Sequence, residues 1–456
     1  MLGVVYIQCT LLAVTAVSGL LISKFSYPAD QALALILSGI LPWLAGVYTS
    51  LITYRLFLNP LNRFPGPFIP RLTGFWQAFY NYKLDGYYRL VHLHEKYGDF
   101  VRIGPNDLSI TDPQAVDLAF SNKLNVSKAS WYDGDAPWTS LHTTRERVKH
   151  DKRRRTWSPA FSEKALREYE PKLDELAEKL IARFSDSKGT PINVTKWFNL
   201  YSFDAMGRLA FGKDYGMLDS GKMHYALKLL TEAMAPLAFR LPVWFLRVMI
   251  SIPYLGAGYQ KFVQFSDDEL AWRVKNSQKV DSDGGADIMT FLLKAYKCIE
   301  APEKDRHLQA DARLIIVAGS DTTAATFTYL FYHLASRPEV VEKLRKELSL
   351  LTFGDWHDAN IRQAPFLNAC IKEALRLHPA VPSGVARKAP AEGLKIGTTV
   401  VPPDTTFWLP TYAIQRGRFR RFAKVRIALI DYRWTKLYRR QRLHPRALDR
   451  ETRAGQ

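Results

Sequence analysis

The sequence predicts a mainly α-helical fold with a small β component, preceded by a membrane anchor. Apolar residues recur at helical spacing over long stretches of the 456 residues, whereas β-like runs are short and are broken by Gly and Pro. Two apolar runs without charged side chains stand at the start of the chain. A chain of this length can bury a large core, so we expect an enzyme-sized body of one or two domains behind the anchor.

The N-terminal anchor is predicted at residues 1–60. Residues 1–22 contain no charged side chain, and the uncharged run 32–54 follows after a short polar loop. Each run approaches the ~20 apolar residues that a membrane-spanning helix needs. The runs predict two transmembrane helices, or one span and a re-entrant segment because of Pro42. Three arginines between residues 55 and 71 follow the second run, which predicts that the main domain faces the cytosol.

The formal net charge of +19 is concentrated at the C-terminus. Residues 417–456 carry 13 Lys and Arg against 3 Asp and Glu, hence +10, and the other 416 residues carry +9. A basic tail can bind nucleic acid or anionic lipid. This one lacks the folded context and aromatic spacing of a nucleic-acid module, so we predict no nucleic-acid partner. We interpret it as an atypical, solvated tail that follows a body at residues 61–416.

The chain contains three cysteines, Cys9, Cys298 and Cys370. Cys9 lies in the first apolar run, and no two cysteines have the spacing of metal ligands. The sequence therefore predicts neither a disulfide framework nor a zinc site, and its cysteine content suits a reducing compartment.

Several elements of the body can be placed by their periodicity and end signals. Residues 100–111 contain two β-like runs joined through Gly-Pro-Asn, which predicts a hairpin. Apolar residues at helical spacing predict an amphipathic helix over 162–184, and a second helix is predicted over 193–212, where Gly ends it. The stretch 365–378 starts with a proline and stops before Pro379, which predicts a third helix.

The stretch from Arg313 to Ala335 predicts a long apolar helix with a small polar patch in its middle. The patch consists of residues that are poor or indifferent helix formers: Gly319, Ser320, Asp321, Thr322 and Thr323. A solvated turn of the helix would explain the patch. A cavity beside the helix, in which a ligand needs close backbone approach and a proton donor, would explain it equally well.

Three further groups of polar residues accompany the patch. Glu373 and Arg376 are three residues apart, which places an acid and a base on one helical face. His150 and Arg154 are one turn apart in a basic run, and Arg387 follows the Glu373 helix closely. Each group alone has an ordinary explanation, such as a chance Glu-x-x-Arg or a solvated basic face. The four groups together, in this order, are more specific.

Together these segments resemble a cytochrome P450, a haem-thiolate monooxygenase, and are similar to fungal microsomal members. The matching sequences are FPGP, GPNDLSI, YSFDAMGRLAFG, AGSDTT, KEALRLHP and PPDTTFWLPTYAIQR, within residues 62–416. The resemblance implies a cytochrome P450 fold, haem b as cofactor and hydroxylation of a hydrophobic small molecule with dioxygen. It also implies electrons from NADPH-cytochrome P450 reductase and a location in the endoplasmic reticulum membrane.

The resemblance assigns a role to each residue of the polar patch. Gly319 would let dioxygen approach the helix backbone, because a Cβ would occupy that space. Asp321 and Thr322 would relay protons during dioxygen activation. Thr323 would steady the helix.

The remaining residues are expected to hold the haem and support its proximal side. Glu373 and Arg376 would form a buried ion pair, with Arg433 as a third partner. Guanidinium groups suit carboxylates, because they offer two parallel donors. The haem propionates would accordingly be bound by three basic residues: His150, Arg154 and Arg387.

The segment after residue 416 departs from the family pattern. Family members place the cysteine that ligates the haem iron well downstream of the Glu-x-x-Arg helix, whereas this chain has no cysteine after Cys370. We therefore expect a C-terminally incomplete cytochrome P450 fold, with the haem-cysteine region missing or replaced, as in a frameshifted or misspliced gene. No residue of this chain is predicted to ligate the metal.

Three functions are compatible with these features. The first is a membrane-bound monooxygenase that hydroxylates a hydrophobic small molecule. The second is a catalytically inactive product that is anchored to the membrane and cannot hold thiolate-ligated haem. The third, which rests on charge alone, is a scaffold that binds anionic lipid through its basic tail.

Overall fold

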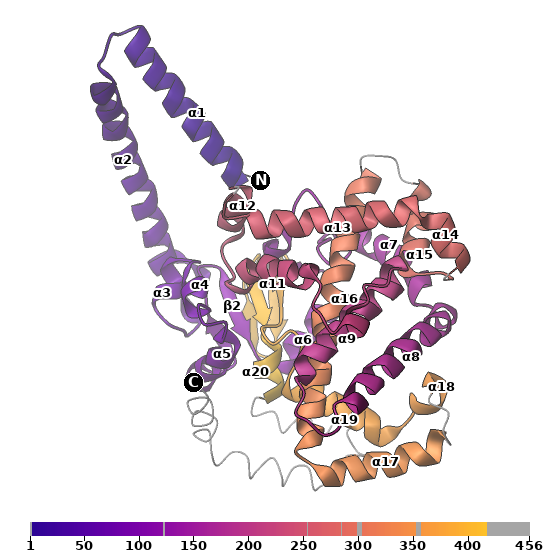
Figure 1. Ribbon diagram of the computed structural model, residues 1–456. Helices are drawn as coiled ribbons and strands as arrows, with labels where there is room; N and C mark the ends of the chain where they lie inside the picture. Colours follow the sequence, from indigo (N-terminus) through magenta and orange to yellow (C-terminus); the bar gives the residue numbers. More distant parts are fainter. Residues whose placement is uncertain are drawn as a thin grey trace.

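The computed structural model describes residues 2–416, except 122–123, 253, 284, 299–302 and 353–356. Within these residues helices dominate, and the strands form one small sheet and one separate pair, which confirms the predicted mainly α fold (Figure 1). The predicted basic tail, 417–456, lies outside the described residues together with Arg433.

Helices make up most of the first half of the chain. They are α1 Leu2–Ser23, α2 Ala29–Thr53, η1 Tyr54–Leu58, η2 Pro60–Arg63, α3 Ile69–Leu72, α4 Trp76–Tyr80, α5 Gly86–Tyr97, α6 Pro113–Phe120, η3 Ser130–Asp133, α7 Arg147–Trp157, η4 Ser158–Phe161, α8 Glu163–Asp186, α9 Val194–Phe211 and α10 Met217–Ser220.

The second half continues this pattern and supplies most of the strands. The helices are α11 Tyr225–Ala238, α12 Val243–Ser251, α13 Ala257–Lys275, α14 Ser277–Asp283, α15 Ile288–Ala295, η5 Tyr296–Cys298, α16 Glu303–Ala335, α17 Pro338–Thr352, α18 Asp358–Ile361, α19 Pro365–Leu377 and α20 Thr411–Arg416. The strands are β1 Phe100–Arg102, β2 Asp107–Ile110, β3 Ser127–Lys128, β4 Val385–Lys388, β5 Leu394–Ile396, β6 Thr399–Val401 and β7 Thr406–Leu409.

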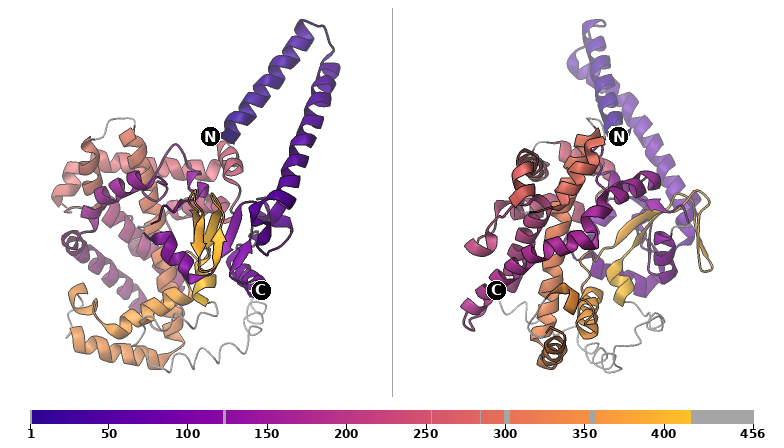
Figure 2. Two further views of the ribbon diagram at one scale, coloured as in Figure 1. Left: turned by 180° about the vertical axis from the view of Figure 1, so that it is seen from behind. Right: turned by 90° about the vertical axis from the view of Figure 1, so that its right-hand side faces the viewer.

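The first two helices, α1 and α2, project from the body as a hairpin (Figures 1 and 2). Helix α2 continues without a break through Pro42, where the sequence left a re-entrant segment open. Within the described residues, two segments are long and apolar enough to cross a membrane, Ala29–Leu58 and Glu303–Ala335. In Ala29–Leu58, the most apolar stretch of 18 residues is 0% buried, whereas the corresponding stretch of Glu303–Ala335 is 28% buried. The second is α16, which belongs to the main core, so the anchor candidate is α2 with η1.

The sheet starts from the predicted hairpin at residues 100–111. Strands β1 and β2 are antiparallel, with Phe100 opposite Ile110. The strand order is β1-β2-β7-β4-β3, and only the β2–β7 pair is parallel. This order places β4, the strand of Arg387, between β7 and β3, with Lys128 directly opposite Arg387. Two residues from distant parts of the chain therefore meet on neighbouring strands.

The predicted helices begin and end at the expected signals. Helix α8 begins after Ser162, whose side chain accepts a hydrogen bond from the backbone N of Ala165. Helix α9 ends at Gly212, which is in the left-handed region with φ 62°. Pro365 is the first residue of α19, which ends at Leu377. These boundaries are confirmed. They could be predicted because a helix cap depends only on residues within about one turn of the helix end.

Asp311 of α16 carries a fully buried carboxylate that joins several segments. Its Oδ1 accepts hydrogen bonds from the Leu141 backbone N at 2.9 Å and from Arg153 Nη2 at 2.7 Å. Its Oδ2 accepts from the Tyr296 hydroxyl at 2.9 Å and from Trp157 Nε1 at 3.2 Å. These donors come from the loop before α7, from α7 itself and from η5. One carboxylate thus fixes three segments to α16.

Replacing Asp311 with Ala should lower the free energy of unfolding by about 3–5 kcal/mol, because Arg153 would remain as an unpaired buried charge. Asp305→Ala is the matched control, since Asp305 is exposed in the first turn of the same helix. The control should cost less than about 1 kcal/mol, the usual value of an acid at a helix start. Urea unfolding of both variants, followed by circular dichroism in detergent, measures the difference. Equal losses would show that Asp311 does not organise the fold.

Candidate functional site

The predicted polar patch lies on an unbroken stretch of α16. The buried Ser320 hydroxyl donates to the Ile316 carbonyl at 2.7 Å, and the Thr322 hydroxyl donates to the Ala318 carbonyl at 2.9 Å. Two threonines further along the helix make the same bond to the carbonyl four residues before them. Because the hydroxyls bond within the helix, these residues are accommodated there without external partners.

Asp321 is the acidic residue of the patch. Its side chain is exposed, and among the described residues it makes no hydrogen bond or ion pair. The surrounding protein nevertheless raises the pKa of Asp321 by partial burial. Thr322 and Thr323 flank its side of the helix and are also reached by solvent. A carboxyl group with a raised pKa and no protein partner is suited to accepting and releasing a proton.

Gly319 faces the neighbouring helix α9. A Cβ at this position would lie 2.9 Å from Cγ and 3.3 Å from Cβ of Met206, which is closer than side chains normally pack. The glycine therefore lets α16 and α9 cross closely in the middle of the body (Figure 1). The expected approach of dioxygen to the Gly319 backbone stays a prediction.

Glu373 and Arg376 lie on one face of α19 and form the expected ion pair. Arg376 donates through Nε and Nη2 to the two Glu373 carboxylate oxygens, each at 2.7 Å, and through Nη1 to the Gln415 carbonyl at 2.9 Å. The expectation of burial is wrong for the described residues, because the two side chains are 32% and 30% exposed. Helix α19 packs on α16 and α20 and buries only Ala374 fully, which leaves this face partly open.

The residues expected to bind carboxylates lie on two separate elements. His150 and Arg154 belong to α7, where His150 contacts Asp151 and Arg154 is exposed. Arg387 belongs to β4 and is partly buried. The buried arginine of the basic run is Arg153, one residue from Arg154, and it is held by Asp311. No contact joins the two α7 residues to Arg387 in the described part of the chain.

Two basic groups beside Arg387 were missed from the sequence. Burial and the charges of Lys128 and Arg387 lower the pKa of His142 to about 4. Burial, followed by the charge of Arg387, lowers the pKa of Lys128 to about 8. The Lys128 ammonium donates to the backbone carbonyls of Leu141 at 3.2 Å and His142 at 2.6 Å. We call Lys128, His142 and Arg387 the basic cluster.

The basic cluster suits an anion. Among the described residues, neither Lys128 nor Arg387 forms an ion pair with a carboxylate, and both lower the pKa of His142. A negative group placed there would relieve this repulsion. No sequence signal marks Lys128, because its position depends on the long-range pairing of β3 with β4. The cluster matches the carboxylates of a haem, which the resemblance implies.

The described residues do not match the axial ligation of that haem. Cys370 is the cysteine whose side chain the structure describes, and it is partly buried on α19. Burial, and then the charge of Glu347 on α17, raises the pKa of the Cys370 thiol to about 11. Iron is ligated by a thiolate, and the surroundings of Cys370 disfavour this charged form. The side chains of Cys9 and Cys298 lie outside the described residues.

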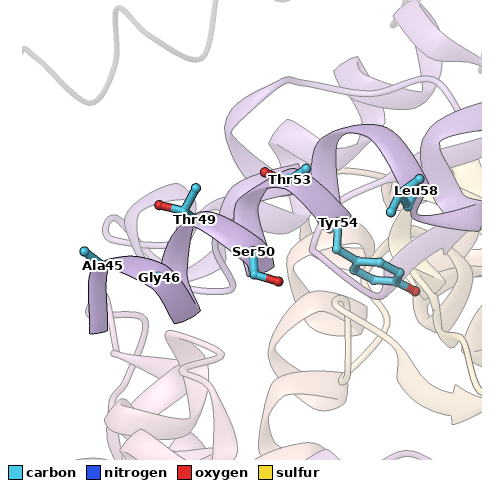
Figure 3. Close-up of a pocket in the computed structure, with 7 residues that line it drawn as sticks. All are labelled: Ala45, Gly46, Thr49, Ser50, Thr53, Tyr54 and Leu58. Atoms are coloured by element: carbon cyan, nitrogen blue, oxygen red, sulfur yellow. The ribbon is translucent and has the colours of Figure 1, made fainter. Parts of the chain in front are cut away.

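A shallow groove lies on the anchor and is distinct from this site. Figure 3 shows it along one face of α2 and η1. It is lined mostly by small residues: Ala45, Gly46, Thr49, Ser50, Thr53, Tyr54 and Leu58. It contains no charged side chain, so it offers no acid or base for catalysis.

A guanidinium group and two imidazole rings are hydrogen-bonded in a row near the C-terminal end of α19. Arg337 Nη1 lies 3.1 Å from His333 Nδ1, and His333 Nε2 lies 3.0 Å from His378 Nε2. Arginine can only donate, so His333 Nδ1 accepts and His333 Nε2 carries the proton that it donates to His378. The His378 ring also stacks on Tyr329, with centroids 3.9 Å apart. Both imidazoles are neutral in this arrangement.

Comparisons with known proteins confirm the predicted resemblance. A family model described as Cytochrome P450 matches residues 65–418. The chain is 38% identical to cytochrome P450 monooxygenase notG' of Aspergillus versicolor, over 83% of this chain and 69% of that protein. It is 36% identical to tryprostatin B 6-hydroxylase of Neosartorya fischeri, over 82% and 69%. It is 39% identical to cytochrome P450 monooxygenase FCK2 of Fusarium pseudograminearum, over 86% and 71%.

Acid should destabilise the protein through His378. Burial, with the charge of Arg416 and the adjacent His333, lowers the pKa of His378 to about 4. The unfolded ring titrates near pH ~6.5. A lowered pKa in the folded state means that stability is fully present above pH ~6.5 and is lost as the pH falls towards 4.

Replacing His378 with Gln should therefore reduce the loss of unfolding free energy between pH 7 and pH 4.5, measured by urea titration at each pH. His92→Gln is the control, because His92 is exposed and pairs only with Glu95. It should keep the wild-type pH profile. Parallel profiles for all three proteins would mean that the His333–His378 bond does not titrate in this range.

Proposed function

The chain belongs to the cytochrome P450 family, and we propose that its fold serves haem-dependent monooxygenation of a hydrophobic small molecule at a membrane. The observation that carries this proposal is Asp321, an unpartnered carboxyl group with a raised pKa on the central helix. When bound through a thiolate, haem supplies the oxidation: dioxygen, two electrons and two protons convert a C–H bond to C–OH and release water.

The residues of this chain have separate roles in the proposal. Asp321 and Thr322 hold and transfer protons on α16, with Thr323 beside them and Gly319 setting the close contact with α9. The basic cluster binds the haem carboxylates, with His150 and Arg154 as further candidates on α7. Arg376 and Glu373 brace α19 against α20, because Arg376 also holds the carbonyl of Gln415.

The substrate proposal follows the relatives only in reaction type. The Neosartorya fischeri and Aspergillus fumigatus relatives are named as tryprostatin B 6-hydroxylases. We carry over hydroxylation, and we propose a hydrophobic small molecule of fungal secondary metabolism as the substrate.

Membrane attachment and the electron donor are also part of the proposal. The exposed, apolar α2 supports anchoring, and basic residues after it support a cytosolic body at the endoplasmic reticulum membrane. Lys149, Lys152 and Arg155 are exposed on α7. They form a positive surface that suits an acidic partner, for which we propose NADPH-cytochrome P450 reductase.

A second candidate function is a membrane-anchored protein that does not hold thiolate-ligated haem. The observation that favours it is the position of Cys370, which is partly buried within helix α19, where burial and Glu347 of α17 raise the pKa of its thiol. The third possibility, a lipid-binding scaffold, depends on residues 417–456, which lie outside the described residues.

The carbon monoxide difference spectrum of the reduced protein separates the first two candidates. The 456-residue polypeptide, expressed with added haem precursor, should show no band near ~450 nm, the signature of a thiolate ligand. The Aspergillus versicolor relative, prepared in parallel, is the positive control. A band at near-stoichiometric haem would overturn the inactive candidate, and Cys370→Ser and Cys298→Ser variants would then identify the ligand.

Deletion of residues 1–61 should move the protein from the membrane pellet to the soluble fraction after carbonate extraction. The physical reason is the loss of about 20 apolar residues per predicted span. Deletion of residues 417–456 is the control and should leave the pellet fraction unchanged. If instead the tail deletion released the protein and the anchor deletion did not, the lipid-binding scaffold would replace the anchored enzyme.

A further inference from the structure

A group of three potential metal ligands lies away from the P450 site, where α8 meets the start of α18 (Figure 1). The group consists of Glu170 and Asp174 on α8 and His357, the residue before α18. One ligand atom from each residue lies within 4.8 Å of the other two. No part of the proposed monooxygenase function uses these residues.

One of the three separations is close to that between two ligands of one small cation. His357 Nδ1 and Glu170 Oε1 are 3.7 Å apart, too far for a hydrogen bond between them. Ligands about 2.1 Å from a tetrahedral Zn²⁺ are ~3.4 Å from one another. The His357–Glu170 separation is close to this value, and the other two separations are at most 4.8 Å. His357 is 62% exposed, so a change in its side-chain conformation does not disturb the core.

The backbone around the three residues is held in place. Glu170 and Asp174 are one helical turn apart, so both point from the same face of α8. The backbone N of Asp358 donates to Glu170, and Arg362 of the same segment pairs with Glu163 of α8 at 3.5 Å. The imidazole is therefore brought to the carboxylates by contacts that do not depend on a metal.

The carboxylates of Glu170 and Asp174 make this part of the surface negative, which favours binding of a cation. Two carboxylates one turn apart repel each other. Two other acids of α8 are paired with arginine, Glu163 with Arg167 and Glu175 with Arg208. In the described part of the chain, neither Glu170 nor Asp174 forms an ion pair with lysine or arginine. The ionisable group that lies beside Glu170 is instead the imidazole of His357, at 3.7 Å.

We propose that Glu170, Asp174 and His357 bind a divalent transition-metal cation, with Zn²⁺ as the best match. One imidazole and two carboxylates are ligands of suitable type, and a water molecule would complete four-coordination. The bound cation would join α8 to the start of α18 and neutralise the two carboxylates. The site is independent of haem and of the anchor.

Calorimetric titration of Zn²⁺ into the full-length, detergent-solubilised and chelator-treated protein tests the proposal. The wild type should bind one Zn²⁺ at this site. His357→Gln and Asp174→Asn should each weaken that binding by at least ~10-fold, the scale seen when even indirect support of a metal is lost. His92→Gln is the matched control, because His92 is an exposed histidine beside a single carboxylate, and it should bind within twofold of wild type.

Thermal unfolding provides a second readout. Zn²⁺ should raise the melting temperature of the wild type and of His92→Gln, but not of His357→Gln, because only a ligand that binds the folded state stabilises it. Circular dichroism of the variants establishes that they are folded. Undiminished Zn²⁺ binding by His357→Gln, or no binding by the wild type, would overturn the proposal. Equal affinity for Mg²⁺ and Zn²⁺ would also overturn it, because it would exclude the imidazole.

Discussion

The buried carboxylate of Asp311 determines how the segments around α16 are arranged. An unpaired charge in that position would be costly, so the carboxylate requires donors on both oxygens. It receives four, and one of them is the guanidinium of Arg153. Burying Arg153 fixes the rotation of α7, and consecutive residues of a helix differ by about 100° around its axis. Arg154 is consequently turned outward to solvent.

The residues of the polar patch lie on two opposite faces of helix α16. Gly319 and Asp321 are two residues apart, hence about 200° apart around the helix axis. Gly319 meets Met206 of α9, whereas Asp321 is exposed on the other side. Ser320 and Thr322 bond to carbonyls of the preceding turn, which keeps the helix intact between the two faces. Residues of low helix propensity thus have two uses here: Gly319 allows close packing on one side of the helix, and Asp321 provides an exposed acid on the other.

Local features of the sequence predicted the helix ends well. The arrangement of the site was harder to predict, because it depends on contacts between residues far apart in the sequence. Ser162, Gly212 and Pro365 mark helix ends because a cap acts within one turn. Lys128 gave no signal, because its neighbour Arg387 is more than 250 positions along the chain. The Arg153–Asp311 pair had a weak signal: Arg153 and Trp157 share one helical face, and Asp311 is a lone acid before an apolar run. Burial of Glu373 was predicted wrongly, because it depends on what packs over α19.

The basic cluster connects the buried framework to the ligand that the family implies. Lys128 and Arg387 lower the pKa of His142, and Arg387 also lowers the pKa of Lys128, so the folded state without an anion carries repulsion there. The backbone of Leu141 is bonded to Asp311, and the neighbouring His142 carbonyl accepts from Lys128. The loop that contains Leu141 and His142 is therefore held on one side by the Asp311 carboxylate, and the basic cluster lies on its other side. An anion bound by the cluster would stabilise the folded state in proportion to its occupancy. Since this stabilisation would use charges and not a thiolate, binding of haem carboxylates at the cluster would not require ligation of the iron.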